Sequence, residues 1–372
     1  MQAGSTTAFT WQEIEQDWLG GSSGLAAAAD DVVVAFNTVA AYFGRDWVEA
    51  SRARSGGPTR GMWPTLHIVA LGRRFAALDG IPNSQVLLDK LRRHQPDAIA
   101  ELTSIYLIRA GNPEGVVETE PEIRVGARNR KPDFRVMVTG QPWTYVEVTN
   151  PNESGAQRDV LRGIEQLTSL LEECTGSFAL EVFLKREPTA AELGELQEHI
   201  MRGHRNTARS EVELPLSLGT MYWNHQQPGN AVLENHGEAY TPRLGRMAAV
   251  IADGDHRHVM VRWPFTDTRV ETFIRHEARQ LPTDAPGLIM IQTSGTVGAM
   301  KAWCSLIEPR FQPRLHTRVS AVCLFGSAVR PTPAGEEWTP ACKIISNPHA
   351  RFPLPLWITQ QLGRFPSDEP DI

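Results

Sequence analysis

The sequence predicts a mixed α/β protein in which helices flank the sheet. Short apolar segments typical of strands occur in both halves of the chain. Segments with apolar residues at three-to-four spacing, typical of amphipathic helices, separate them. Between residues 96 and 201 the expected order is helix, three strands, helix, strand and helix, which favours a mixed sheet.

Length and composition set the domain organisation that we expect. The chain has 372 residues, a formal charge of -6 and 41% hydrophobic residues, which is sufficient for a large core. We expect a helical region at residues 1–95, an α/β core at 96–201 and a C-terminal α/β extension of that core at 202–372. A single elaborated α/β domain is the alternative that this length allows.

Composition also restricts the compartment and the class of protein. No apolar run approaches the roughly 18 to 20 residues that span a membrane, and the first residues lack the pattern of a signal peptide. The four cysteines lie far apart without a Cys-x-x-Cys pair, so we expect reduced thiols in a cytoplasmic protein with no zinc knuckle. The mild acidity argues against a generic nucleic-acid coat protein but allows an enzyme with a local basic groove.

The N-terminal region is expected to be mostly helical. Residues 25–43 are rich in Ala and Val and predict a buried helix that ends at Gly44. Residues 67–78 and 84–94 predict two further helices. The Arg-, Gly- and Pro-rich residues 51–64 predict a loop before them.

The next expected helix, residues 96–110, carries an acidic residue on its apolar face. Glu101 shares this face with Ile105 and Ile108 at helical spacing. Glu101 is therefore either a functional carboxylate, a buried Glu paired with an Arg, or the edge of the apolar stripe at the surface.

Two adjacent strands within residues 131–150 organise the expected core. Gly140 and Pro142 mark the turn between them. Because strand side chains alternate between faces, Asp133 and Glu147 are expected on paired strands, each among apolar neighbours. A carboxylate there is costly unless a hydrogen bond or a positive charge satisfies it, and a divalent metal ion is one such charge.

The other expected elements lie on both sides of this pair. A strand at 116–125 precedes it, and residues 202–245 are expected to be irregular. The later α/β segments are expected to extend the first sheet. In chain order, the downstream elements are a helix at 157–173, a strand at 178–184, a helix at 187–201, strands at 247–252 and 258–263, a helix at 268–281, a strand at 287–293, a helix at 297–307 and a strand at 319–325.

Several familiar motifs fail in this sequence. The segment Ser294-Gly-Thr-Val-Gly298 lacks the lysine of a phosphate-binding loop. His276-Glu277 lacks the second histidine of a zincin helix. Asp255-His-Arg-His258 lies in an expected turn without a third ligand, so we interpret it as solvated.

The combination of Glu101, Asp133 and Glu147 resembles the PD-(D/E)XK nuclease superfamily. Pro132-Asp133 opens one strand, Glu147-Val148-Thr149 lies on the next, and Glu101 lies on the preceding helix. The helix, three strands, helix and strand from about residue 96 to 185 follow a similar order, so the resemblance covers roughly a quarter of the chain. It implies a restriction-endonuclease-like mixed sheet flanked by helices.

The resemblance also implies an activity, which is metal-dependent hydrolysis of phosphodiester bonds in DNA more than in RNA. Asp133 and Glu147 would be the primary ligands of Mg²⁺ or Mn²⁺, with Glu101 as an auxiliary ligand. Such an ion activates a water molecule and stabilises negative charge on the phosphate. Many nucleases of this group act as dimers, so the resemblance also allows a homodimer.

The sequence departs from the family pattern at Thr149, which stands where the family usually has a lysine. A hydroxyl group cannot supply the positive charge that positions the attacking water. Another catalytic side chain would have to replace it. The candidates are Lys131 beside Asp133 and the polar residues of the following helix, namely Gln157, Arg158, Arg162 and Gln166. That row of polar residues is equally consistent with an ordinary solvated helix face.

Basic residues surround the motif and suggest contacts with nucleic acid. The cluster contains Arg124, Arg128, Arg130, Lys131 and Arg135, against Glu122 and Asp133. Each phosphate that such side chains neutralise adds salt-sensitive affinity. We expect the contacts to come from Arg128 and Arg130, and from Arg158 and Arg162 on the following helix. The alternative is that these are solvated charges of a loop and an edge strand.

Three hypotheses therefore remain from the sequence. The first is a metal-dependent nuclease, and the second is a binding or scaffold protein that kept the fold and lost activity with the lysine. The third is a cytoplasmic α/β enzyme of another class, with Asp133 and Glu147 in structural ion pairs. The first requires the two carboxylates to converge, whereas an Arg partner for each would favour the third.

Overall fold

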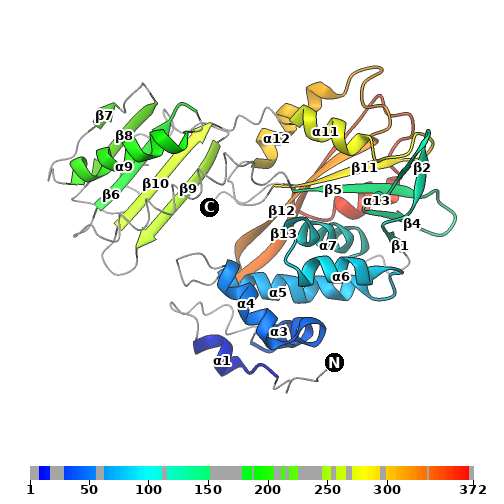
Figure 1. Ribbon diagram of the computed structural model, residues 1–372, viewed down its shortest axis with the longest axis horizontal. Coiled ribbons are helices and arrows are strands. Elements are labelled where there is room, and N and C mark those ends of the chain that lie inside the picture. The colour runs from blue at the N-terminus through cyan, green and yellow to red at the C-terminus, as the bar shows by residue number, and fades with distance from the viewer. Residues whose placement is uncertain are drawn as a thin grey trace. The chain divides into compact units, whose positions relative to one another are not determined.

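The protein is described by a computed structural model, and the described residues are 8–16, 29–55, 63–110, 115–150, 178–186, 188–204, 211–213, 218–224, 245–252, 257–264, 270–293, 299–332 and 335–367. The chain divides into two compact units (Figure 1). The first comprises Met1–Asn150, Val270–Ser294 and Cys304–Pro370. The second comprises Pro151–Arg269, Gly295–Trp303 and Asp371–Ile372.

The first unit begins with a group of helices, as the sequence predicts. These are α1 (Trp11–Gln16), α3 (Ala29–Phe43), α4 (Arg45–Ser55), α5 (Trp63–Phe75), the 3₁₀ helix η1 (Ala76–Leu78), α6 (Ser84–Arg92) and α7 (Pro96–Arg109). Gly44 ends α3 with a positive φ of 89°, which glycine adopts without steric cost. The expected loop at 51–64 is wrong in part, because α4 continues to Ser55 and α5 begins at Trp63.

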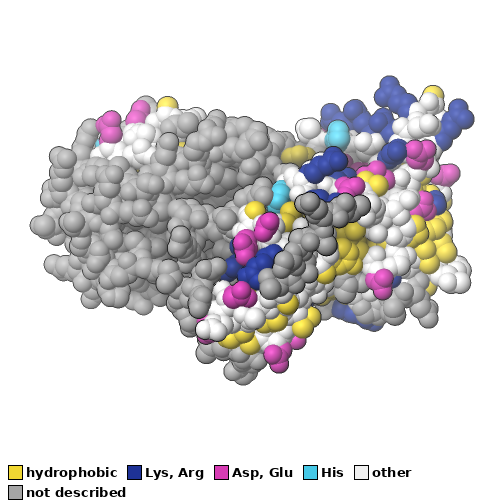
Figure 2. Space-filling model, turned by 60° about the horizontal axis from the view of Figure 1, so that its bottom comes forward, with side chains coloured by type: hydrophobic (Ala, Val, Ile, Leu, Met, Phe, Trp, Pro, Cys, Tyr) yellow, Lys and Arg dark blue, Asp and Glu magenta, His cyan; other side chains and the backbone are white. Residues whose placement is uncertain are grey.

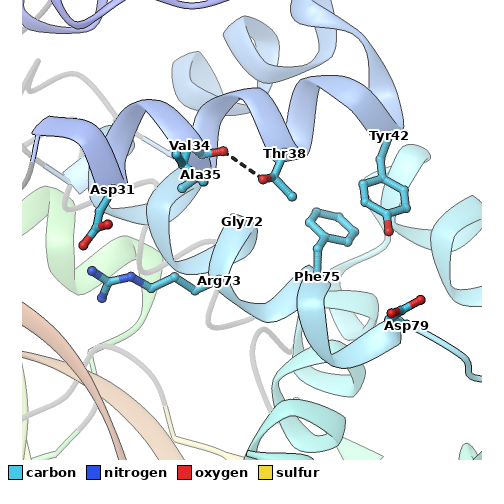
Figure 3. Close-up of a pocket in the computed structure, with 9 residues that line it drawn as sticks. All are labelled: Asp31, Val34, Ala35, Thr38, Tyr42, Gly72, Arg73, Phe75 and Asp79. Carbon is cyan, nitrogen blue, oxygen red and sulfur yellow. Dashed lines mark hydrogen bonds between the residues drawn. The ribbon is translucent and has the colours of Figure 1, made fainter.

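Helices α3 and α5 pack closely because α5 has a glycine at their contact. A Cβ atom at Gly72 would lie 2.6 Å from the backbone oxygen of Ala35. Figure 3 shows this contact beside an open groove of about 510 Å³, where the Thr38 hydroxyl donates a hydrogen bond to the Val34 carbonyl. Buried aromatic residues, including Phe36 and Phe75, continue the core here.

A six-stranded mixed sheet forms the centre of the first unit. Its strands, in spatial order, are β1 (Val116–Thr119), β4 (Phe134–Met137), β5 (Thr144–Thr149), β11 (Gly287–Gln292), β12 (Ala321–Thr332) and β13 (Gly335–Ser346). Strands β1, β4 and β5 pair antiparallel, β5, β11 and β12 pair parallel, and β13 returns antiparallel to β12. The predicted mixed α/β class with flanking helices is confirmed.

The sheet differs from the expected core in its fourth strand. We expected the segment at 178–184 to follow the central pair, but β6 (Phe178–Leu184) belongs to a separate five-stranded sheet. The neighbour of β5 is instead β11, and the helix that contacts both strands is α11 (Val270–Ala278). Strands from both sides of residue 201 share each sheet, since β5 lies beside β11 in the first and β6 beside β10 in the second.

The second unit contains the five-stranded sheet. Its strands, in spatial order, are β7 (Glu211–Glu213), β8 (Gly219–Asn224), β6, β10 (Arg257–Pro264) and β9 (Gly245–Ala252), and the described helix between β6 and β7 is α9 (Ala190–His204). The predicted hairpin of β9 and β10 is confirmed. The expectation of an irregular segment at 202–245 is wrong where β7 and β8 form.

The other described elements are α12 (Ala299–Ile307), the 3₁₀ helix η3 (Glu308–Arg310) and α13 (Leu356–Leu362). Helix α13 packs on α7, where the side-chain amide of Gln361 donates hydrogen bonds to the carbonyls of Leu107 and Ala110. These bonds satisfy carbonyl groups at the C-terminal end of α7, which lack partners within the helix. Among the described helices, none has the length and apolar character to cross a bilayer.

The expected strand at 116–125 is two strands in the structure. After β1, the chain turns away into a separate two-stranded hairpin of β2 (Ile123–Val125) and β3 (Arg128–Arg130). Gly126 makes its turn with a positive φ of 61°. The chain then returns to the sheet as β4. Free thiols are found at Cys304, Cys323 and Cys342, whereas Cys174 lies outside the described residues.

Candidate functional site

The two carboxylates singled out from the sequence lie on neighbouring strands at one end of the six-stranded sheet. Asp133 directly precedes β4, and Glu147 lies on β5. Phe134 pairs with Val146, so the same antiparallel register places Asp133 opposite Glu147. The Val148 amide donates a 2.7 Å hydrogen bond to the Asp133 carboxylate. The predicted pairing of these two strands is confirmed.

Glu147 is deeply buried and incompletely hydrogen-bonded. Its exposed fraction is 5%, because α7 and α11 both contact the central strand β5. Its Oε1 atom has no hydrogen-bond partner in the part of the chain that the structure describes. Burial, followed by the negative charges of Asp133, Glu277 and Glu101, raises the pKa of Glu147 to about 10. The site therefore holds a carboxyl group whose ionised form lacks compensation.

The pKa of Asp133 is also raised, but less than that of Glu147. Burial and the charge of Glu101 raise its pKa to about 7, against the lowering effects of the Val148 amide and Lys90. Among the described residues, neither Asp133 nor Glu147 forms an ion pair, so the structural ion pairs of the third hypothesis are not found in that part of the chain. A positive charge placed between the two would favour the ionised form of both.

Glu101 lies near this pair but already has a cationic partner. The Lys90 ammonium on α6 lies 3.0 and 3.1 Å from the two oxygens of Glu101 on α7. It also lies 2.9 Å from Glu120, the residue after β1. Burial would lower the pKa of Lys90, but the attraction of Glu101 and Glu120 exceeds that effect and raises it. The open question about Glu101 is thus answered in part, since it is a buried Glu paired with Lys90 rather than with an Arg.

Glu120 reaches Lys90 through an unusual backbone conformation. Its φ is 48°, in the left-handed region that residues other than Gly, Asn and Asp seldom occupy. The Glu120 amide donates a 2.8 Å hydrogen bond to the carbonyl of Asp133, so this conformation is tied to the strand that carries the site. Local strain of this kind is concentrated at functional sites in proteins.

Two further carboxylates join the cluster from α7 and α11. Asp97 lies one turn before Glu101, and its carboxylate accepts a hydrogen bond from the Asn150 backbone amide. Burial raises the pKa of Glu277, while His276, 3.3 Å away, and the Thr149 side chain lower it. The charge of Glu277 also acts on Asp133 and Glu147. The Thr149 side chain therefore contacts a carboxylate of this cluster.

The sequence reasoning missed four members of this cluster. The spacing of Asp97 and Glu101, four residues apart on one helix, could have revealed the first. Glu277 was noted only as part of a failed zincin motif. Lys90 and Glu120 carried no signal, because their meeting depends on how α6 packs beside β1.

The other residues expected at the site lie elsewhere in the described structure. Lys131 forms a 3.0 Å ion pair with Glu122, and 57% of its side chain is exposed. Arg128 and Arg130 lie on the β2–β3 hairpin, away from the sheet itself. Gln166, Arg158 and Arg162, together with the rest of the expected helix at 157–173, lie outside the described residues.

The residues present fit a divalent cation with few protein ligands. Within the described ranges, no three His, Cys, Asp or Glu side chains are arranged as a metal-binding group. Mg²⁺ is commonly held by one or two carboxylates and several water molecules. The unpartnered Glu147 oxygen opposite Asp133 supplies such a pair.

Comparison with protein-family models, curated proteins and solved structures finds no match to this chain.

Proposed function

We propose that this protein is a metal-dependent nuclease that hydrolyses phosphodiester bonds, with DNA as its substrate. The observation that carries the proposal is the unpartnered, buried Glu147 oxygen opposite Asp133, at the sheet end where other carboxylates gather. Buried carboxylates without cations are costly, so a fold that collects them is best explained by a bound cation.

The order of elements supports a likeness to the PD-(D/E)XK fold. The fourth strand of that fold would be β11 and not the segment at 178–184 that the sequence suggests. Helix α7 is followed by β1, β4 and β5, and then, after residues 151–269, by α11 and β11. This is the helix, three strands, helix and strand order of the superfamily, with β11 parallel to β5. Residues 151–269, the largest part of the second unit, then represent an insertion between the third strand and the second helix of that order.

Asp133 and Glu147 would hold Mg²⁺ or Mn²⁺, and Glu101 and Glu277 would hold water molecules around it. The ion would supply activation of water and stabilisation of the phosphate charge when bound. Two contacts with Lys90 hold the Glu101 carboxylate in place. The Val148 amide fixes the Asp133 carboxylate in the same way.

Lys90 is the cation that we propose in place of the family lysine. Its charge lowers the pKa of Asp97, Glu101, Asp133 and Glu147, so it acts on four carboxylates of the cluster. Its ammonium group is held by Glu101 and Glu120 beside the site. Lys131, the candidate from the sequence, is engaged with Glu122 instead.

A binding protein without catalysis is the second candidate function. The contact between Thr149 and Glu277 favours it, because a carboxylate rather than a cation stands beside the position of the family lysine. In that case the cluster would serve to bind a metal ion or to retain the fold, and the chain would bind nucleic acid without cutting it.

Cleavage assays distinguish the two functions. We expect the full-length protein to cut supercoiled plasmid DNA with Mg²⁺ or Mn²⁺ and not with EDTA. Asp133→Asn and Glu147→Gln should each lose at least about 100-fold in rate, because each removes a charged ligand of a metal-assisted step. The control is Asp284→Asn, an exposed residue of the same unit. Cutting that persists in both site variants would contradict the proposal, and no cutting by the folded wild type would favour the binding protein.

A further inference from the structure

We propose that the β2–β3 hairpin is a ribbon that enters the major groove of duplex DNA beside the candidate site. This inference rests on the proposed function and names its substrate class as B-form duplex DNA. The hairpin is a separate two-stranded sheet formed by Ile123–Val125 and Arg128–Arg130. Nothing in the carboxylate cluster itself requires a hairpin at this point of the chain.

The hairpin leaves the sheet at the same edge as the carboxylates. It is inserted between the end of β1 and the start of β4, where Thr119 pairs with Phe134. Phe134 in turn pairs with Val146, one residue before Glu147. Because Asp133 immediately precedes β4, the base of the ribbon adjoins the candidate site. A duplex held by the ribbon would present its backbone to this edge.

The hairpin is strongly basic and its charges are available to solvent. Arg124 and Arg128 are exposed, Arg130 is half-buried, and none of these three forms an ion pair with a described residue. The remaining charges are Lys131 and Glu122, which pair with each other. Figure 2 shows Lys and Arg side chains gathered at its right-hand edge, on the side where β2 lies in Figure 1. This excess of positive charge is the footprint of a phosphate-binding surface.

The register distributes the arginines over both faces of the ribbon. Arg124 pairs with Asn129, whereas Val125 pairs with Arg128 and Ile123 with Arg130. Since paired residues share a face and neighbours alternate, Arg124 and Asn129 lie on one face, and Arg128 and Arg130 on the other. A ribbon with cations on both faces can contact the phosphates of both strands that border a groove. Asn129 adds an amide, a group suited to adenine edges.

The shape of the ribbon selects the form of the duplex. The major groove of B-form DNA, about 12 Å wide, admits a two-stranded β-ribbon. The major groove of A-form RNA is too deep and narrow for protein side chains to read. The ribbon therefore favours double-stranded DNA over double-stranded RNA, and over single strands that have no groove.

The test is equilibrium binding of the full-length protein in EDTA, so that cleavage does not interfere. Fluorescence anisotropy would compare duplex DNA, duplex RNA and single-stranded DNA of one sequence over a range of salt concentrations. The variant is Arg124→Gln/Arg128→Gln, which removes one cation from each face. Its matched control is Arg93→Gln/Arg364→Gln, which removes two exposed arginines of the same unit from other elements.

We expect the wild type to bind duplex DNA at least about tenfold more tightly than duplex RNA. The hairpin variant should lose about 2 from the slope of log affinity against log salt, roughly 0.9 for each lost phosphate contact, whereas the control variant should keep the wild-type slope. Equal affinity for duplex DNA and duplex RNA would contradict the proposed groove binding by the ribbon. Equal losses of salt slope in the hairpin variant and the control variant would contradict it as well. Duplex DNA binding that depends on the hairpin without any cleavage would support the ribbon while contradicting the proposed hydrolysis. Cleavage unaffected by the hairpin variant, with unchanged DNA binding, would overturn the ribbon alone.

Discussion

At the level of single residues, Glu147 is the carboxyl group of the site whose pKa is raised most. Its side chain is buried on the central strand β5, which α7 and α11 both contact, and one of its carboxylate oxygens has no hydrogen-bond partner among the described residues. The pKa of this group rises to about 10 because burial and neighbouring carboxylates oppose its charge. The pKa of Asp133, which lies opposite Glu147, rises to about 7 because of burial and, after it, the charge of Glu101. The metal-free protein therefore stores an electrostatic cost that a cation would relieve.

This cost predicts a pH dependence of stability for the metal-free protein. Both groups have pKa values in the folded state above their values near 4 in the unfolded state. Their contribution to the stability of the folded state is therefore fully present below pH 4 and is lost as the pH rises. For Asp133 the loss falls between about pH 4 and 7, and at 1.36 kcal/mol per pKa unit it amounts to roughly 4 kcal/mol. We expect urea unfolding in EDTA to show the wild type less stable at pH 8 than at pH 5.

The matched variant for this measurement is Asp133→Asn, which removes the titrating group and keeps its shape. We expect its stability to change less over the same pH range, and the exposed control Asp284→Asn to follow the wild type. Parallel pH profiles for Asp133→Asn and the wild type would show that the Asp133 carboxyl is not strained in the metal-free state.

At the level of elements, Lys90 joins three parts of the chain at the edge of the site. It extends from α6 to Glu101 on α7 and to Glu120 after β1, with distances of 3.0 and 2.9 Å. Glu101 is buried, so the pair is protected from the screening that weakens exposed ion pairs. Loss of one partner leaves the other charge uncompensated, which is the costly way to break such a pair.

Substitution of Lys90 therefore has a definite signature. We expect Lys90→Met to destabilise the protein by on the order of 3 kcal/mol in urea unfolding, because Glu101 is left buried and unpaired. Lys90→Met/Glu101→Gln should recover part of that stability, since the uncompensated charge is gone, yet cleavage should stay low because the cation is still missing. Lys90→Arg should retain more of the stability and more of the cleavage rate than either of these two variants, because it keeps a cation at this position. A Lys90→Met protein as stable and active as the wild type would refute this role.

At the level of the whole molecule, the sequence reasoning was correct where the signals are local. The hairpin-like pair β4 and β5 has apolar alternation and a turn marked by Gly140 and Pro142, so the sequence alone predicts that Asp133 and Glu147 lie on paired strands. The α/β class followed from the same kind of periodicity. Glu101 was found because a carboxylate interrupts an apolar helical stripe.

The failures involve contacts between segments far apart in the chain. Strand β11 pairs with β5 across residues 151–269, and a parallel pair needs no turn that the sequence could display. The apolar segment at 178–184 was therefore a plausible but incorrect neighbour for β5, because strand periodicity does not specify the partner. Glu277 was missed for the same reason, since it reaches the site only through α11 and its contact with β5.

The central claim is that Asp133 and Glu147 together hold a divalent cation. The most direct test is Mn²⁺ titration of the full-length protein, followed by electron paramagnetic resonance of the free ion, for the wild type, Asp133→Asn, Glu147→Gln and the control Asp284→Asn. We predict saturable binding by the wild type and the control, with affinity at least about tenfold weaker in each site variant, because each removes one of two carboxylate ligands. Equal Mn²⁺ binding by all four proteins, or none by the folded wild type, would contradict the account.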